Sequence, residues 1–183
     1  PPGGTKAVLG TNPIAMSVPD GKGALAMQFD QSTSAIALGK INMAATAGEK
    51  IPLGWGVDSE GQATQDPSAV LNGGSLVSSG GYKGYGFGLM AEILAAAFTG
   101  GSTSTQLDPL KASEGKPHDL GQCYIIIDPT NVAGDLFWEK LSTISEAVTS
   151  QPGARIPGAN KVLPEAVELD VDVWESVKQL AGV

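Results

Sequence analysis

The sequence has 183 residues, of which 42% are hydrophobic and 16% are charged, so it predicts a globular domain of ordinary size and excludes a disordered chain. Its formal net charge of −8 argues against nucleic acid as a partner, because phosphate backbones are bound by clustered Lys and Arg. The longest apolar stretch is too short to span a bilayer and no signal peptide is recognised, so we expect no membrane partner.

Single copies of cysteine and histidine limit the chemistry further. Cys123 has no second cysteine to pair with, so a reducing, cytoplasmic location is expected. His118 lies in a polar loop beside Pro117, and we interpret it as incidental to catalysis. Zinc and iron sites need several His or Cys ligands, so no metal site is expected, and nothing in the spacing supports a Ser-His-Asp triad.

The first third of the chain predicts a hairpin followed by a helix. Two short strands, Ile14–Val18 and Ala24–Phe29, flank the turn residues 19–23. Polar residues 30–34 then precede an apolar helical stretch at residues 35–47. These short side chains could cap that helix, or they could converge on a ligand at its start.

A glycine-rich segment, residues 79–88, precedes good helix formers at residues 89–98. Glycines allow close approach of a ligand to the backbone, and the first turn of a helix carries N–H groups without partners. With the Lys83 ammonium and the helix dipole, these groups predict a site for a phosphate or a carboxylate. The alternative is a tight turn with a solvated lysine.

The rest of the chain predicts a mixed α/β domain. Residues 51–67 form a turn-rich loop, of the kind that carries function or packs as a compact surface unit. Gln122–Asp128 is apolar enough to predict a strand covered on both faces. Amphipathic helices are expected at residues 134–150 and from Asp172 to Leu180. The glycines do not follow the Rossmann pattern, so the residues alone indicate an α/β domain that binds an anionic ligand.

Five groups of motifs occur in order along almost the whole chain. They are Gly10-Thr11-Asn12-Pro13-Ile14-Ala15; Asp30-x-Ser32-Thr33-Ser34 with Gly39-Lys40; Gly54-Trp55-x-x-Asp58-x-x-Gly61 with Thr64-x-Asp66-Pro67; Gly80-Gly81-Tyr82-Lys83-Gly84-Tyr85-Gly86; and Arg155-x-Pro157-Gly158.

This set resembles the malate/L-lactate dehydrogenase family of NAD(P)-dependent oxidoreductases, which also holds ureidoglycolate dehydrogenase, sulfolactate dehydrogenase, diketogulonate reductase and piperideine-carboxylate reductase. The resemblance implies a non-Rossmann nucleotide-binding domain at residues 1–128, built on a largely antiparallel sheet flanked by helices. Residues 129–183 would be a helical segment that completes the fold. It also implies a homodimer that uses NAD or NADP to interconvert a small 2-hydroxyacid and its 2-oxoacid.

The same resemblance implies which residues bind the cofactor. The family usually has an acidic residue after the last glycine of the late motif, and Ala159-Asn160 replace it here. Asp30 is also a candidate for orienting a catalytic histidine, with cofactor contact or capping as alternatives. The implied cofactor-binding residues are Asn12, Phe29, Asp30, Gln31, Ser32, Thr33, Ser34, Tyr82, Lys83, Arg155, Gly158, Ala159 and Asn160.

The catalytic histidine of the family comes from the N-terminal part of the full-length chain, and His118 does not match its position. The sequence resembles only the C-terminal portion and begins at Pro1 without methionine, so we expect the N-terminal portion to be a partner. Hydride transfer to a carbonyl needs a proton donor within reach, so this chain alone is predicted to be inactive. Two alternatives stay open. One is a non-redox module that binds a phosphorylated or carboxylated ligand, and the other is an inactive fragment that keeps the dimer core.

Overall fold

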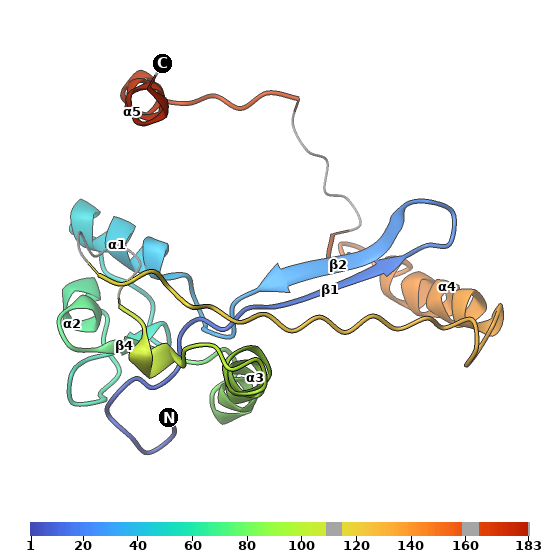
Figure 1. Cartoon of the computed structure of the whole chain (residues 1–183), viewed down its shortest axis with the longest axis horizontal. Coiled ribbons are helices and arrows are strands. Elements are labelled where there is room, and N and C mark those ends of the chain that lie inside the picture. Colours follow the sequence, from blue (N-terminus) through green and yellow to red (C-terminus); the bar gives the residue numbers. More distant parts are fainter. Residues whose placement is uncertain (109–114, 159–164, 183) are drawn as a thin grey trace.

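The computed structural model describes residues 1–108, 115–158 and 165–182, and shows a mixed α/β chain with two small antiparallel sheets and several helices (Figure 1). A long hairpin runs through the middle of the molecule, with helices at both of its ends. The predicted cofactor residues Ala159 and Asn160 lie outside the described residues.

The hairpin consists of β1 (Ile14–Pro19) and β2 (Leu25–Gln31), paired antiparallel with Met16 opposite Phe29. The Asp20 carboxylate closes the turn by accepting hydrogen bonds from two backbone N–H groups, those of Lys22 at 2.7 Å and Ala24 at 2.9 Å. These two bonds hold the pKa of Asp20 below its usual value. The predicted hairpin is therefore confirmed, because its turn chemistry is entirely local.

A small core lies at one end of the hairpin. It joins α1 (Leu38–Ala47), α2 (Pro67–Leu71) and a second sheet of β3 (Gly56–Val57) and β4 (Ser75–Leu76). The predicted helix at residues 35–47 begins three residues late, because the Ala35 N–H donates to the Val77 carbonyl at 2.8 Å and residues 35 and 36 form a bend. The buried centre of this core is formed by Ile41, Ile51 and Val70.

Helix α3 (Tyr82–Glu92) continues directly into a π-helical turn, η1 (Ile93–Ala97). The helix therefore begins seven residues earlier than Leu89, inside the glycine-rich segment that was predicted to be a turn. Close packing explains the difference. A Cβ at Gly84 would lie 1.6 Å from the Ser79 carbonyl oxygen, and one at Gly88 would lie 3.0 Å from Thr33 Oγ1. Glycine lets this face of the helix touch the neighbouring backbone, which outweighs its poor helix propensity.

The predicted strand Gln122–Asp128 is wrong, since these residues have no assigned regular structure. Figure 1 shows the segment extended, running from the α1 end of the molecule toward α4 (Leu136–Thr149). The side chains of Tyr124, Ile125, Ile126 and Ile127 are 72–95% exposed. A strand exists only where another strand supplies hydrogen-bond partners, and none of the described segments does so here.

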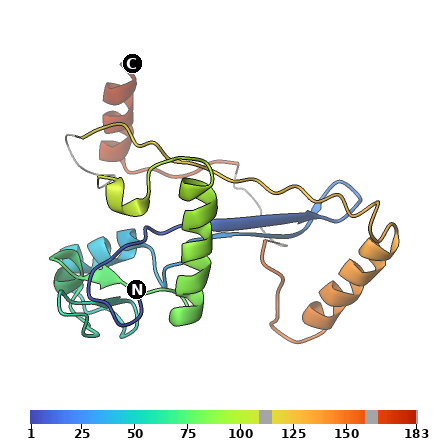
Figure 2. The same ribbon diagram turned by 60° about the horizontal axis from the view of Figure 1, so that its bottom comes forward.

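Two helices complete the described chain, and both were predicted to within two residues. Helix α4 lies near the hairpin turn, where a Cβ at Gly21 would meet the Trp138 ring at 3.1 Å (Figure 2). Helix α5 (Val171–Ala181) stands apart in Figure 1. Neither helix has a buried residue. Over residues 1–108, 115–158 and 165–182, no helix is long and apolar enough to cross a membrane. A short 3₁₀ turn, η2 (Ser104–Gln106), follows η1.

Candidate functional site

The polar segment after β2 lies between two other parts of the chain. The Thr33 N–H and hydroxyl both donate to the Thr11 carbonyl, at 2.8 and 3.1 Å, and the Thr33 carbonyl accepts from the Ser79 N–H at 2.9 Å. Ser34 forms an antiparallel bridge with Ser78. Three stretches that are far apart in the sequence therefore meet at Thr33.

The hydroxyl groups of this segment bond to one another and to the backbone. Ser32 Oγ lies 2.9 Å from Ser34 Oγ, and Ser34 Oγ donates to the Ile36 carbonyl at 2.9 Å. The N-cap residue of α1 is Ala37, which has no side-chain capping bond. The alternative that this segment caps α1 is therefore wrong. Its side chains instead form a row of hydroxyls between β2 and α1.

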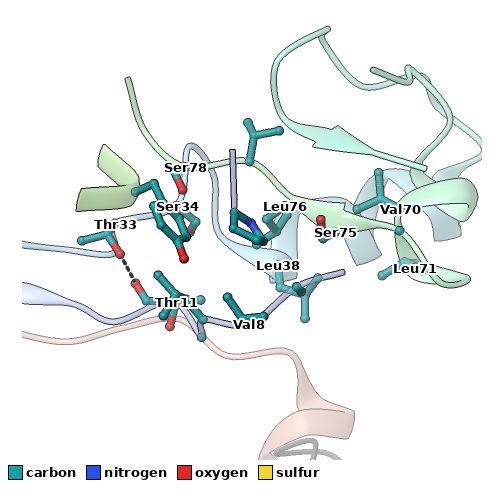
Figure 3. A pocket seen from close by; sticks show the side chains of 17 residues that line it. Val8, Thr11, Thr33, Ser34, Leu38, Val70, Leu71, Ser75, Leu76 and Ser78 are labelled. Atoms are coloured by element: carbon teal, nitrogen blue, oxygen red, sulfur yellow. Dashed lines mark hydrogen bonds between the residues drawn. The ribbon is translucent and has the colours of Figure 1, made fainter. Parts of the chain in front are cut away.

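A cavity of about 390 Å³ opens beside this segment (Figure 3). Its walls combine apolar side chains with hydroxyl groups, and Thr33, Ser34 and Thr11 lie together at one end. Such a mixture suits a small organic ligand, since the apolar walls bury its surface and the hydroxyls orient it. The side chains labelled in Figure 3 are Val8, Thr11, Thr33, Ser34, Leu38, Val70, Leu71, Ser75, Leu76 and Ser78.

The start of α3 is joined to the hydroxyl row through Ser79. Gly80 and Gly81 follow with φ angles of 67° and 66°, and no atom lies within 4 Å of the Cβ that either would carry. Lys83 belongs to the first turn of the helix and is exposed, as is Tyr82. Backbone N–H groups and a lysine at the open end of an 11-residue helix can attract an anion.

The late motif lies against β2. The Gln28 N–H donates to the Pro157 carbonyl at 2.9 Å, and a Cβ at Gly158 would lie 2.6 Å from the Gln28 carbonyl oxygen. Gly158 also has a φ of 78°, so both the close approach and the backbone conformation require glycine there. Pro157 and Gly158 thus contact Gln28, which directly precedes Phe29 and lies about 130 residues earlier in the chain.

Asn12 contacts α3, because its amide nitrogen donates to two acceptors, the Gly88 carbonyl at 3.0 Å and Glu92 Oε2 at 2.8 Å. An amide nitrogen has two hydrogens, so both donors are used within the chain and only Oδ1 remains for a ligand. Asn12 also has a φ of 37°, in the left-handed region. These bonds give it a structural task that the sequence did not indicate.

Glu92 and Ser104 were missed by the sequence analysis. Glu92 accepts from the Ser104 N–H at 2.5 Å and from the Ser104 hydroxyl at 2.6 Å. Partial burial raises the pKa of this carboxyl, but the bonds from Ser104 and Asn12 outweigh it and hold the pKa of Glu92 below its usual value. One signal could have found it, since Glu92 is the only charged residue between Lys83 and Asp108.

Asp30 is exposed and stands opposite Ala15 in the hairpin. Within the described ranges, no three His, Cys, Asp or Glu residues are grouped so that they could hold a metal ion. The site that results is a row of hydroxyls on β2 and its extension, the glycine-rich start of α3 at one side, and the late motif at the other. This arrangement brings together, in a mixed α/β chain, donor groups of the kind that bind small organic anions.

Comparison with known proteins gives the family. The model of the malate/L-lactate dehydrogenase family matches residues 1–175. The chain therefore belongs to this family, in agreement with the resemblance of its motifs.

Two curated relatives illustrate the similarity. A Delta(1)-pyrroline-2-carboxylate/Delta(1)-piperideine-2-carboxylate reductase of Pseudomonas putida is 37% identical over 183 residues, which is 100% of this chain and 53% of the relative. A (2R)-3-sulfolactate dehydrogenase (NADP(+)) of Chromohalobacter salexigens is 37% identical over 161 residues, covering 88% of this chain and 47% of the relative. The chain thus spans about half the length of these relatives.

Solved structures agree with the sequence relatives. The delta1-piperideine-2-carboxylate reductase of Pseudomonas syringae is 40% identical, with a TM-score of 0.71, over 81% of this chain and 45% of that one. The sulfolactate dehydrogenase of Methanocaldococcus jannaschii is 29% identical, with a TM-score of 0.76, over 98% of this chain and 54% of that one. The fold is therefore shared with dehydrogenases and reductases.

Proposed function

We propose that this chain forms the dinucleotide-binding part of an NAD(P)-dependent oxidoreductase. One observation carries the proposal: three segments that the motifs assign to the cofactor are joined by backbone hydrogen bonds. Thr33 bonds to Ser79 at the start of α3, and Pro157 bonds to Gln28 on β2. Family membership and the NADP(+) in the name of one relative support the same choice of ligand.

The donor groups of this site fit a dinucleotide. The exposed Lys83 ammonium and the first-turn N–H groups of α3 would hold its phosphates. The hydroxyls of Ser32, Thr33 and Ser34 and the backbone beside Phe29, Asp30 and Gln31 would orient its ribose and nicotinamide parts. Gly158 would allow close approach at the other side. Arg155, Ala159 and Asn160, which the resemblance also assigns to the cofactor, are its neighbours in the sequence. When bound, the nicotinamide ring supplies or accepts a hydride.

We propose that the substrate is a small 2-oxoacid, reduced at C2 to the 2-hydroxyacid. The hydride goes to C2, and the carbonyl oxygen gains a proton. We assign the proton donor to a histidine on polypeptide outside this sequence, with Asp30 to orient its ring. On this basis the 183-residue chain binds the cofactor but does not catalyse hydride transfer by itself.

A cyclic 2-imino acid is the second candidate substrate. The observation that favours it is that relatives at 37–40% identity are named pyrroline-2-carboxylate or piperideine-2-carboxylate reductases. The two substrate classes share a carboxylate next to the reducible carbon, and they differ in whether oxygen or nitrogen takes the proton.

We propose two protein partners, a second copy of the chain and the polypeptide that carries the histidine. The exposed run Tyr124–Ile127 and the unburied faces of α4 and α5 support the need for partners. One solved relative supports the same proposal. This chain matches 54% of it, so the rest of that relative is available to cover the corresponding surfaces.

Titration with NADPH and NADH tests the function. We expect one of the two nucleotides to quench the tryptophan emission of the chain when it binds. Lys83→Gln should weaken this binding about tenfold, since one charged hydrogen bond to a phosphate is lost. Lys22→Gln in the hairpin turn is the matched control and should leave affinity unchanged. Failure to bind either nucleotide would reject the proposal and favour a non-redox module.

Substrate choice is tested on the enzyme in the form in which the cell makes it. Oxidation of NADPH is followed with pyruvate, oxaloacetate and 3-sulfopyruvate as oxoacids, and with Δ1-piperideine-2-carboxylate as the imine. Higher kcat/KM for the imine would replace the first candidate by the second. Equal rates with the isolated chain would contradict the placement of the histidine elsewhere.

A further inference from the structure

Glu92 ends α3 and joins three parts of the chain that no motif connected. Its two oxygens accept from three donors: the Ser104 N–H, the Ser104 hydroxyl and the Asn12 amide. The carboxylate is partly shielded from water. It is thus the centre of a small network rather than a surface charge.

The network continues toward the predicted cofactor site. Asn12, held at a φ of 37°, follows Thr11, whose carbonyl accepts both the N–H and the hydroxyl of Thr33. Thr11 and Thr33 both line the cavity described above. A non-glycine residue in the left-handed region costs free energy, and it persists there only where its surroundings hold it. The bond from Asn12 to Glu92 is therefore positioned to fix the carbonyl that receives Thr33.

We propose that Glu92 is a positioning residue for dinucleotide binding, which acts on Thr33 through Asn12 and Thr11 without touching the ligand. The identity of the ligand in this inference rests on the proposed function. The internal link, from Glu92 through Asn12 and Thr11 to Thr33, is a property of the chain alone and does not depend on that function.

A carboxylate is required at this position because every partner is a donor. In Glu92→Gln, one acceptor oxygen becomes an NH₂ group. If the NH₂ replaces Oε2, it faces the Asn12 amide, and if it replaces Oε1, it faces the Ser104 N–H. In either orientation an N–H donor of the new amide faces another N–H donor. The isosteric variant therefore breaks the network with almost no change in volume.

Amide hydrogen exchange measured by NMR on the apo chain tests the internal link. We expect Glu92→Gln to speed exchange at the Thr33 and Ser104 amides about tenfold, while the amides of α1 and β1 keep their rates. Glu139→Gln on α4, whose carboxylate accepts a hydrogen bond from its neighbour Lys140, is the matched control. Unchanged exchange at Thr33, or a uniform acceleration through α1 and β1, would overturn the positioning role.

Titration of the same variants with NADPH tests the functional consequence. We expect Glu92→Gln to raise the dissociation constant about tenfold and Glu139→Gln to leave it unchanged. Ser104→Ala, which removes one of the three donors and keeps the N–H bond, should give a smaller rise and serves if Glu92→Gln does not fold. Normal affinity in both network variants would overturn the inference. Absence of binding in the unsubstituted chain would instead reject the proposed function, and the exchange result would still decide the internal link.

Discussion

Residues 1–108 and the described residues after them, 115–158 and 165–182, differ in how they use their apolar side chains. The first region holds all five buried hydrophobic residues found in the described part of the chain, namely Val18, Ile41, Ile51, Val70 and Ala96. The second region has two helices without a buried residue and a run of nearly fully exposed isoleucines. Amphipathic patterning is present in both, so patterning alone does not tell whether the covering surface belongs to the same chain.

The largest expected difference concerns single isoleucines. Ile41→Ala should lower the free energy of unfolding by about 2–5 kcal/mol, because Ile41 is 0% exposed at the centre of the core. Ile126→Ala should change it by less than about 0.5 kcal/mol, since Ile126 is 95% exposed. Urea unfolding followed by circular dichroism measures both. Equal losses would mean that residues 122–128 are packed in solution, which would break the comparison.

Glycines on α3 provide the second test. Gly84→Ala should destabilise the chain by about 3 kcal/mol, because the new Cβ would lie 1.6 Å from the Ser79 carbonyl oxygen and cannot be accommodated without moving backbone. Gly86→Ala is the matched control two residues away, where no atom lies within 4 Å of the added Cβ. It should stabilise by about 0.5–1 kcal/mol through helix propensity. Thermal melts of the two variants, shifted in opposite directions, would support the packing of α3.

Helix caps give a smaller contrast. Asp66 accepts a hydrogen bond from the Ser68 N–H at 2.8 Å at the start of α2, so Asp66→Ala should cost about 1 kcal/mol. Asp170 precedes α5 without a side-chain capping bond, and Asp170→Ala should cost less than about 0.5 kcal/mol through the helix dipole alone. Chemical denaturation measures both. A larger loss at Asp170 would show that α5 is held more firmly than its contacts indicate.

The smallest expected effect lies on α5. Lys178 and Glu175 form an ion pair at 2.7 Å, one turn apart. Since Glu175 is exposed and Lys178 is only half-buried, Glu175→Gln should cost about 0.2–0.5 kcal/mol of helix stability and the loss should vanish in high salt. Helicity by circular dichroism at low and high ionic strength measures this. A salt-independent loss would point to packing of Glu175 rather than charge.

The parts of the fold that depend only on residues close in the sequence were predicted correctly. The hairpin turn, with Asp20 bonded to Lys22 and Ala24, belongs to this group, and so do the bounds of α4 and α5. The start of α3 at Tyr82 could not be predicted, because glycine propensity favours a turn and only contact with Ser79 reverses it. The strand predicted at residues 122–128 was wrong for the opposite reason. Their sequence favours a strand, but no partner strand lies beside them among the described residues.

The sequence predicted which residues belong to the candidate site, but it did not predict which of them contact one another. The motifs gave Ser32–Ser34, Lys83 and Gly158 as separate positions along the chain. Hydrogen bonds between Thr33 and Ser79 and between Gln28 and Pro157 join these segments. Contacts over such distances in the sequence cannot be predicted from the spacing of residues. Asn12 was predicted as a ligand contact, but both its donors serve Gly88 and Glu92. Its contact with a cofactor through Oδ1 stays a prediction.

The exposed run Tyr124–Ile127 also affects how the chain behaves at high concentration. Consecutive β-branched residues without proline can stack with identical copies into fibrils. Mutual repulsion from the net charge of −8 opposes such stacking near neutral pH. Acidification neutralises the carboxylates that provide this repulsion, so colloidal stability of the purified material is governed by pH as much as by folding.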